Sequence, residues 1–494
     1  MTDDHQLRDH ACSVDDHQER PMTIQWPEMP AFQQGFRRQI FLGWDARDGY
    51  KRCWSAPEDS VGIVGPPRYG KTSGLIIPTL LWWEGPLVCT STRGDILGFT
   101  GDLRQRLADQ YGGRIHVYDP FGSEFPQLSM HWSPLADCED PSVCYRRVAA
   151  MTAVSGQGVS DGDHWRAGAA IILRAYFHAA ALERLPMAAV RRWLAGQEVR
   201  DPVAILRLAS TGAEIWADDL EAMQLIGDRE RGSFYSVARN TLEATAEPKV
   251  LASCDRTDLD IDEFLATRSS LFIIGPSHQQ QAIAPLMAGL VDSIAQRAAE
   301  VAAGQGGRLD PPLLLALDEI ANIAPLQSLP SLVSEGGGRG IITMWASQSL
   351  AQLRSRYGEE QQSAILAATT AKLIFGGISS GDDLRDISSW AGEEKQNLTS
   401  TVIGPQGAAP SGQIGVNQST GMQQMSMSQA LIPVLPTNAI QMLPPFNAWL
   451  FWRSERPRQV EARPAGAIPQ LAQLRGFTPR SPDGWSDPYA RSQR

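Results

Sequence analysis

The chain has 494 residues, of which 43% are hydrophobic and 20% are charged, and this balance excludes a disordered or collagen-like protein. At about 150 residues per domain, the length accommodates one to three domains. The formal net charge of −11 excludes a uniformly basic nucleic-acid coat, so any nucleic acid that the chain handles must meet a local basic patch.

The cysteines and the apolar segments narrow the class of protein further. Six cysteines are scattered without a C-x-x-C pair, which argues against a disulfide framework or a zinc site and favours a reducing compartment. The acidic, polar start of the chain lacks the features of a signal peptide. The longest apolar stretch, residues 74–83, is too short to cross a bilayer. We therefore expect a soluble, cytoplasmic chain without a transmembrane segment.

In chain order, residues 1–40 are an acidic tail without periodicity. Residues 41–54 alternate apolar pieces with turn residues, which predicts a hairpin. The next elements expected are strands at 61–64, 87–90 and 115–118, with helices between them at 73–83 and 95–111. Strands separated by helices predict βαβ units and a parallel sheet, so residues 41–140 are expected to form the first part of an α/β domain.

The middle of the chain, residues 141–254, has a different character, because Ala, Leu and Arg dominate and strand patterns vanish. Helical periodicity recurs in this region at 164–185, 202–217 and 233–245. We therefore expect an all-helical domain inserted in the α/β domain. Strand patterns then return at 270–274, 312–317, 341–346 and 372–375, so residues 255–452 are expected to complete the α/β domain.

Two later segments are expected to be irregular. Residues 397–427 are rich in Gly, Ser, Gln and Asn, which predicts a long exposed loop. Residues 453–494 hold eight arginines against four acids, together with several prolines, which predicts a loosely structured basic tail. Such a tail either contacts DNA or anionic lipid or is a merely solvated terminus, and the sequence leaves both interpretations open.

The strongest chemical signal is GPPRYGKT at residues 65–72, which fits the phosphate-loop pattern G-x-x-x-x-G-K-[ST]. A strand enters this loop and an apolar helix leaves it, so successive N–H groups are expected to curl around a phosphate at the helix N-terminus. Lys71 is expected to reach the β- and γ-phosphates, and the Thr72 hydroxyl to ligate Mg²⁺. The nucleotide-binding residues expected from the motif are Gly65, Pro66, Pro67, Arg68, Tyr69, Gly70, Lys71, Thr72 and Ser73.

A second signal is the apolar run LLLAL at 313–317, which Asp318 and Glu319 follow directly. Such a run suits a central parallel strand, and acids at its carboxyl end lie where α/β sheets place ligands. Asp318 is expected to hold the Mg²⁺ shell, and Glu319 to polarise the attacking water. The competing interpretation, a strand that ends in solvated acids, loses weight beside the phosphate loop.

Four further residues carry weaker signals. Gln348 follows the strand expected at 341–346, and it either senses the γ-phosphate and orients the water or is a polar strand end. Arg339, in the glycine turn GGGRG, is either an arginine finger that reaches a neighbouring subunit's γ-phosphate or a solvated loop arginine. Lys372 and Arg68 are candidates for phosphate contacts, although structural roles fit them better.

The order of these segments resembles the coupling proteins of type IV secretion systems, the TraG and TraD group. The resemblance runs from about residue 41 to residue 457 and rests on the phosphate loop, the helical insertion, LLLALDE, GGGRG and SQ. VYDPF at 117–121 and HW at 164–165 also resemble the family's pattern, whereas QALIP at 429–433 lacks the basic residues that many members carry there. The resemblance implies a RecA-like ATPase domain that uses ATP and Mg²⁺, is capped by an all-α domain and assembles as a homo-hexamer when active.

The resemblance also implies partners and a place of action. Members of this family deliver single-stranded DNA bound to a relaxase-type protein into a type IV secretion channel, at the inner face of the cell membrane. They usually begin with transmembrane helices, which this sequence lacks. We therefore expect a peripheral protein that docks onto a separate membrane partner, or an ATPase that works in solution.

Three functions are compatible with these residues. The first, which we favour, is a DNA-translocating motor or coupling ATPase of a conjugative system. The second is a receptor or docking platform, in which the helical insertion recruits the substrate and nucleotide controls assembly without DNA pumping. The third is a phosphate-loop enzyme that modifies a small molecule, and the lack of a further convergent set of His, Asp or Cys disfavours it.

Overall fold

The computed structural model describes residues 37–45, 47–48, 51–155, 162–402 and 424–467. Residues 1–36 of the expected acidic tail and residues 468–494 of the expected basic tail lie outside the described residues.

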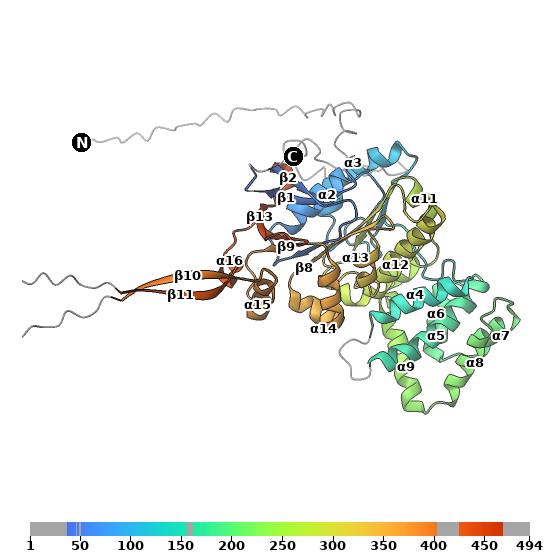
Figure 1. The fold of residues 1–494 in the computed structure, drawn as a ribbon. Coiled ribbons are helices and arrows are strands. Elements are labelled where there is room, and N and C mark those ends of the chain that lie inside the picture. The colour runs from blue at the N-terminus through green and yellow to red at the C-terminus, as the bar shows by residue number, and fades with distance from the viewer. Residues whose placement is uncertain (1–36, 46, 49–50, 156–161, 403–423, 468–494) are drawn as a thin grey trace, which may run out of the picture. The chain divides into compact units, whose positions relative to one another are not determined.

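An eleven-stranded mixed sheet organises the described residues (Figure 1). Its seven central strands run parallel in the spatial order β9-β3-β8-β7-β4-β6-β5, which confirms the expected parallel sheet. Four antiparallel strands extend one side in the order β2-β1-β13-β12 and include the expected hairpin, β1–β2. The strand bounds are β1 Phe41–Asp45, β2 Lys51–Trp54, β3 Val61–Val64, β4 Leu87–Ser91, β5 Ile115–Tyr118, β6 Ser270–Ile274, β7 Leu313–Leu317, β8 Ile341–Ser347, β9 Ala371–Phe375, β12 Asn447–Trp452 and β13 Arg458–Glu461.

The central strands are apolar because helices cover both of their faces. Every residue of β3, β4, β6, β7 and β8 is buried, as expected for parallel strands that read as continuous apolar runs. The helices that connect these strands are η1 Thr72–Ile76, α2 Ile77–Trp82, α3 Asp95–Asp109, α12 Gln280–Gly304, α13 Leu329–Glu335, α14 Leu350–Ala368 and α15 Gly381–Trp390.

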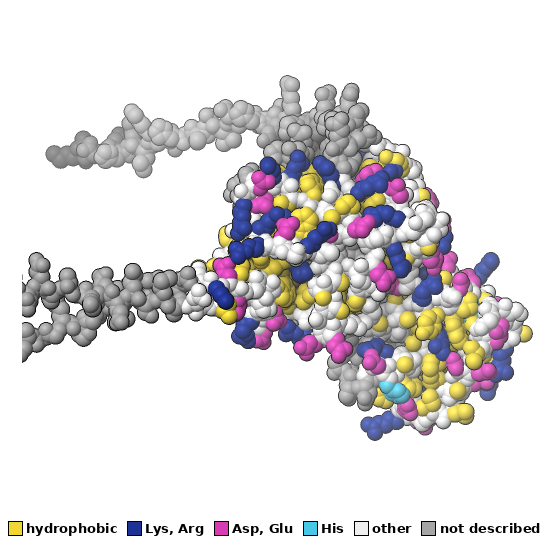
Figure 2. Space-filling view, viewed as in Figure 1, with side chains coloured by type: hydrophobic (Ala, Val, Ile, Leu, Met, Phe, Trp, Pro, Cys, Tyr) yellow, Lys and Arg dark blue, Asp and Glu magenta, His cyan; other side chains and the backbone are white. Residues whose placement is uncertain are grey.

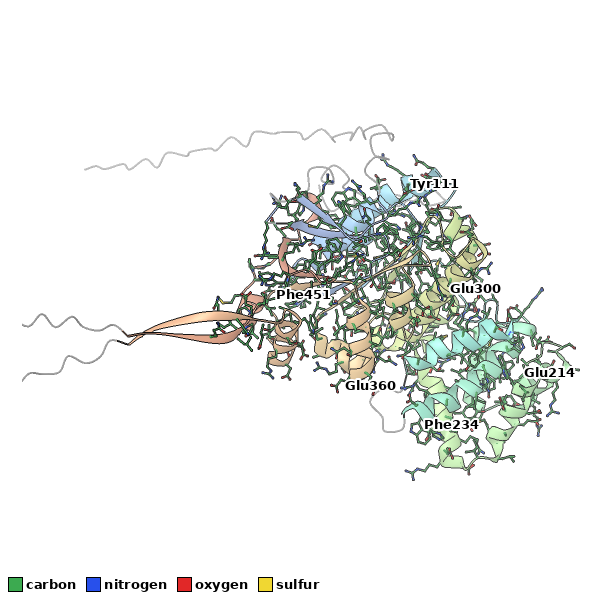
Figure 3. All side chains as sticks on the ribbon, viewed as in Figure 1. Tyr111, Glu214, Phe234, Glu300, Glu360 and Phe451 are labelled. Carbon is green, nitrogen blue, oxygen red and sulfur yellow. The ribbon has the colours of Figure 1, made fainter. Side chains whose placement is uncertain are left out.

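A run of helices is inserted between β5 and β6. The helix α5 lies at its centre and packs against α4, α7, α8 and α9, and Phe234 of α9 is buried within it (Figure 3). The insertion rests on the sheet domain through the contact between α4 and α12. Its elements are α4 Pro141–Ala153, α5 Gly162–Leu182, α6 Met187–Gly196, α7 Arg200–Leu208, α8 Ile215–Ala222, η2 Met223–Leu225, α9 Asp228–Thr241, η3 Glu243–Ala246, α10 Pro248–Ser253 and α11 Ile261–Ala266.

The loop expected at 397–427 is wrong at both of its ends. β10 (Glu393–Val402) and β11 (Gln424–Pro433) pair antiparallel through ten registers and form a separate two-stranded sheet, which we call the arm. Residues 403–423, the middle of the expected loop, lie outside the described residues. The Gly, Ser, Gln and Asn content of residues 397–427 favours a loop and outweighs the one strand signal in this stretch, the alternation of Met425 and Met427 with serines in β11.

The start of the expected basic tail belongs to the sheet. Arg458–Glu461 form β13, which lies between β1 and β12 and pairs with both. The strand is four residues long and has Val460 as its one apolar side chain, so backbone pairing rather than an apolar pattern defines it. The prediction of loose structure is therefore wrong for these four residues.

Candidate nucleotide-binding site

Three adjacent parallel strands bring the expected site residues to one edge of the sheet. The phosphate loop follows β3, Asp318 and Glu319 follow β7, and Gln348 follows β8, which lies between β3 and β7. Because the carboxyl ends of parallel strands meet at the same edge, these residues gather although the chain separates them widely. At this edge, the backbone N–H of Gly65, after β3, donates a hydrogen bond to the carbonyl of Ser347, at the end of β8, at 3.2 Å.

The phosphate loop has a fixed conformation that needs glycine at two positions. At Gly65, a Cβ atom would come within 2.6 Å of the Phe375 side chain, and at Gly70 within 2.4 Å of the Phe446 ring. Gly70 also has φ +99°, in the left-handed region that disfavours other residues. A helix begins directly after the loop, at Thr72, so the N–H groups of the loop lie next to those of the helix N-terminus.

Lys71 is buried inside the loop. Its Nζ donates to the carbonyl oxygens of Gly65 at 2.5 Å and Pro66 at 2.9 Å. Burial lowers the pKa of this amine, while the negative charges of Asp318 and Glu319 oppose that shift. An ammonium group has three N–H donors, so two bonds to the loop leave one for a phosphate oxygen.

Asp318 lies directly beside the start of the phosphate-loop helix. Its Oδ2 accepts a hydrogen bond from Thr72 Oγ1 at 2.8 Å, and its Oδ1 accepts one from the Glu319 N–H at 3.0 Å. Thr90 of β4 donates to the Asp318 carbonyl at 2.9 Å and fixes the backbone. Burial raises the pKa of Asp318 to about 6, and Glu319 adds to the rise, whereas Thr72 and Lys71 oppose it.

The donor set of Thr72 and Asp318 fits Mg²⁺. Both supply oxygen, which this ion prefers, and Mg²⁺ in nucleotide sites is commonly held by one or two protein groups together with phosphates. A buried carboxylate with a raised pKa gains from a cation beside it. No cluster of three or more His, Cys, Asp or Glu suited to a metal occurs among the described residues, so this pair remains incomplete without phosphate oxygens.

Glu319 and Gln348 face each other across the end of β8. Gln348 Nε2 donates to Glu319 Oε1 at 3.2 Å. Glu319 has φ +48°, a conformation that costs an L-residue about 1–2 kcal/mol, so the surrounding structure holds it there against its preference. The Ile320 N–H donates to the Ala346 carbonyl of β8 at 3.0 Å, which ties this turn to the strand before Gln348.

Gln348 is held in place by two residues, Gln352 and Asp383, that the sequence did not identify as part of the site. Gln352 Oε1 accepts from the Gln348 N–H and from Ser347 Oγ, both at 3.2 Å, and Asp383 Oδ2 accepts from the Leu350 N–H at 3.0 Å. Neither residue belongs to a recognisable motif. A signal that was available is the helix start at 349–352, because Ser349 is a typical N-cap and its Oγ accepts from the Gln352 N–H at 3.1 Å.

Phe446 also contacts the phosphate loop, and the sequence did not identify it as part of the site. Its N–H donates to the Tyr69 carbonyl at 2.9 Å, its carbonyl accepts from Ala462 at 2.7 Å, and its φ is +64°. The segment before β12 is therefore fastened to the tip of the phosphate loop. No sequence pattern marks Phe446, because its backbone bond to Tyr69 and the approach of its ring to Gly70 both join segments that are far apart in the chain.

The basic residues with weaker signals are Arg68, Lys372 and Arg339, and they lie in different parts of the sheet domain. Arg68 is an exposed residue of the phosphate loop. Lys372 lies near the amino end of β9, where its Nζ donates to the carbonyls of Leu366 at 3.1 Å and Thr369 at 2.8 Å, so it lies apart from the loop.

Arg339 precedes β8 and therefore lies at the edge opposite Gln348, which follows the same strand. Seven strand residues separate the two edges by about 23 Å. Arg339 Nη2 pairs with Glu335 Oε2 at 3.0 Å. The Arg339 side chain therefore cannot serve the phosphate loop of its own chain.

Among known proteins, the family model for type IV secretory system conjugative DNA transfer matches residues 21–417. The chain is 26% identical to conjugal transfer protein TraG of Escherichia coli over 349 residues, which cover 65% of this chain and 53% of TraG. It is 22% identical to protein VirD4 of Rhizobium rhizogenes over 326 residues, which cover 63% of this chain and 46% of VirD4. The chain thus spans about half the length of these relatives.

Solved structures of the bacterial conjugative coupling protein TrwB share the fold. The unbound form of its ΔN70 variant matches with a TM-score of 0.63 and 19% identity, covering 88% of this chain and 92% of that chain. TrwB with the ATP analogue ADPNP gives 0.60 at 18% identity, covering 82% and 87%, and TrwB with ADP and Mg²⁺ gives 0.59 at 18%, covering 87% and 94%. Within the described part of this chain, no helix has both the length and the apolarity needed to cross a bilayer.

Proposed function

This chain belongs to the type IV secretory system conjugative DNA-transfer family, and we propose that it hydrolyses ATP to drive transfer of a DNA–protein substrate through a type IV secretion channel. The observation that carries the proposal is the 2.8 Å hydrogen bond from Thr72 of the phosphate loop to Asp318 at the end of β7. It joins the two halves of an ATP site beside the amine of Lys71. The complexes of TrwB with ADPNP and with ADP and Mg²⁺ support nucleotide and Mg²⁺ binding at this site.

Each residue then has a distinct task in hydrolysis. The loop from Gly65 to Ser73 wraps the phosphates with its N–H groups, and Lys71 donates to the β- and γ-phosphate oxygens. Thr72 and Asp318 would hold Mg²⁺, which would supply neutralisation of the phosphate charge. Glu319 accepts a proton from the attacking water, and Gln348, already bonded to Glu319, orients that water.

We propose a homo-hexameric ring as the active form; the number of copies comes from the family resemblance, and the position of Arg339 supports a site shared between neighbouring copies. Since Arg339 and the phosphate loop lie at opposite edges of one sheet, an arginine finger must come from a neighbouring copy. The Arg339–Glu335 pair has side chains that are 53% and 65% exposed, so its release costs about 1 kcal/mol or less. The Arg339 side chain can therefore leave Glu335 at a small cost in free energy when a neighbouring copy's phosphate is near.

The remaining parts are assigned from family membership and topology. Residues 41–140 and 255–452 act as the ATPase domain, residues 141–254 receive the substrate, and residues 1–40 and 453–494 are terminal extensions. The substrate is single-stranded DNA with a relaxase-type protein. The protein works at the inner face of the membrane, on the channel or on a separate membrane partner.

ATP turnover by the purified full chain, with and without single-stranded DNA at low salt, tests this function. The motor predicts Mg²⁺-dependent hydrolysis that single-stranded DNA increases. The receptor alternative predicts nucleotide-dependent assembly and substrate transfer that persists in Glu319→Gln, which binds ATP without hydrolysing it. An assembled wild-type protein whose turnover ignores DNA counts against the motor.

A further inference from the structure

The arm, β10 and β11, has no backbone partner strand among the described residues beyond its own two strands, and its side-chain pair with the main domain is the exposed contact between Glu394 and Arg456 at 2.8 Å. Its ten paired registers extend for about 33 Å, and no strand of the main sheet pairs with it among the described residues. An isolated two-stranded ribbon is marginally stable in water, and its outer edges offer unpaired backbone groups. Figure 1 shows the arm leaving the body of the sheet domain. The arm therefore needs a surface outside the described fold.

We call residues 393–395 and 431–446 the root of the arm. The root is hydrogen-bonded to the edge of the sheet that carries the phosphate loop. β11 leads into α16 (Thr437–Gln441), and the Gln441 carbonyl accepts from the Gly377 N–H at 2.9 Å. Five residues later, Phe446 donates to the Tyr69 carbonyl of the phosphate loop at 2.9 Å. On the other strand, β10 begins just after α15, whose Trp390 packs edge-on against Phe451 of β12 with ring centroids 5.8 Å apart.

The chemistry of the arm does not suit a polyanionic partner. Its charged residues are Glu393, Glu394 and Lys395 at the start of β10, and no Asp, Glu, Lys, Arg or His occurs from residue 396 to residue 452, so the arm offers phosphates one cation against two acids. Two large apolar side chains at the root are exposed instead, Leu431 by 61% and Met442 by 78%. Figure 2 shows hydrophobic side chains where the arm meets the body. An apolar protein surface is the partner that fits.

A suitable surface lies at the opposite edge of the sheet. Between α12 and α13 is a hollow of about 160 Å³ that has mainly apolar walls. Ala295, Ala299, Leu332 and Ile341 contribute to these walls, and Arg339 lines the same hollow. The candidate arginine finger thus lies beside an apolar hollow of its own chain.

We propose that Leu431 and Met442 at the arm root of one copy pack against the Arg339 hollow of a second copy of this chain. The inference rests on the proposed function, because it supplies the contact that carries Arg339 to a neighbour's phosphate loop. The arm root lies on the loop's edge and the hollow on Arg339's edge, so one contact brings the two parts of the active site together. It joins different surfaces head to tail, and such contacts close into rings when the rotation permits.

The test uses the full chain with Mg²⁺ and ADPNP, followed by sedimentation velocity over a range of protein concentrations. Leu431→Glu/Met442→Glu is expected to raise the concentration needed for assembly by about tenfold or more, because it places carboxylates against apolar walls. Leu208→Glu/Leu225→Glu is the matched control, since these side chains of the insertion are 87% and 90% exposed. Equal effects of the two double variants, or none in the arm variant, overturn the proposal.

A second variant tests the direction of the contact. Ser331 is exposed and lines the hollow, so Ser331→Glu is expected to weaken assembly from the other side. A mixture of Ser331→Glu with the arm variant retains one sound contact, between the Ser331→Glu arm and the arm variant's hollow. The mixture is therefore expected to form dimers but no ring, although neither variant associates alone. A mixture that stays monomeric contradicts the head-to-tail contact.

Failure of this inference and failure of the proposed function give different results. A wild-type protein that hydrolyses ATP but stays monomeric at every concentration removes the arm contact and leaves the nucleotide site standing. A wild-type protein that assembles through Leu431 and Met442 but takes up no nucleotide in calorimetry removes the ATPase and leaves the contact. The arm variant should bind ADPNP with wild-type affinity as a monomer.

Discussion

Thr72 and Asp318 are 246 positions apart in the chain, yet the hydroxyl of one donates to the carboxylate of the other at 2.8 Å. The contact joins the start of the phosphate-loop helix to the carboxyl end of β7, two strands away from β3 in the sheet. The Asp318 carboxyl group is buried, and burial raises its pKa to about 6. Its protonation therefore falls in an accessible pH range.

Mg²⁺-dependent nucleotide binding should weaken as the pH falls through about 6, because a protonated Asp318 is a poor ligand for the ion. Calorimetry with ATP between pH 5 and pH 8, at constant Mg²⁺, measures this change. Asp318→Asn should bind ATP weakly at every pH and lose the pH dependence. A wild-type affinity that stays constant from pH 8 to pH 5 contradicts the role of Asp318.

The raised pKa of Asp318 affects stability in the opposite direction to nucleotide binding. A fall in pH weakens Mg²⁺-dependent binding, but it favours the folded, nucleotide-free chain. Since the pKa of Asp318 in the folded chain exceeds the ordinary 3.8, its stabilising contribution is present at low pH and is lost as the pH rises through about 6. Asp318→Asn should therefore raise the free energy of unfolding at pH 8 by about 2–3 kcal/mol in nucleotide-free protein, and by less at pH 5. Urea unfolding at the two pH values measures the difference.

Glu319→Gln should keep nucleotide affinity and lower turnover by about 10²–10⁴-fold, because a general base contributes to the chemical step and not to binding. Gln348→Ala should lower turnover less, since it removes the group that holds Glu319 Oε1 and leaves the base itself. Single-turnover hydrolysis with saturating ATP compares the two. A Glu319→Gln protein with wild-type turnover excludes Glu319 as the base.

The two partly or fully buried lysines provide a matched pair. Lys71 and Lys372 each donate to two backbone carbonyls, and burial lowers the pKa of both amines. Lys71→Ala should abolish ATP binding or turnover, because its third donor serves the phosphates. Lys372→Ala should lower the melting temperature and leave ATP affinity unchanged. Equal losses of affinity in both variants, measured by calorimetry on folded protein, contradict the specific role of Lys71.

The sequence predicts those parts of the fold and site that depend on a local pattern. β3, β7 and β8 are readable because two buried faces demand continuous apolar runs, and the phosphate loop is readable because its backbone shape demands Gly65 and Gly70. The arm is harder to predict, since the Gly, Ser, Gln and Asn content of residues 397–427 obscures the short alternation of Met425 and Met427 with serines. The role of Phe446 cannot be predicted either, because its backbone bond to Tyr69 and the approach of its ring to Gly70 join distant segments and leave no local pattern in the sequence.

Arg339→Ala should lower turnover by about 10³-fold or more in the assembled protein and leave ATP affinity unchanged, because a finger stabilises transition-state charge supplied by another copy. Arg308→Ala is the control, since Arg308 is an arginine near the same edge that pairs with Glu58 and should leave turnover unchanged. Mixing Arg339→Ala with Lys71→Ala should restore part of the activity. In a mixed ring, some sites combine an intact phosphate loop from the first variant with Arg339 from the second. Normal turnover in Arg339→Ala alone, or a mixture with no activity above its parts although mixed rings form, removes Arg339 from the active site and returns it to its surface pair with Glu335.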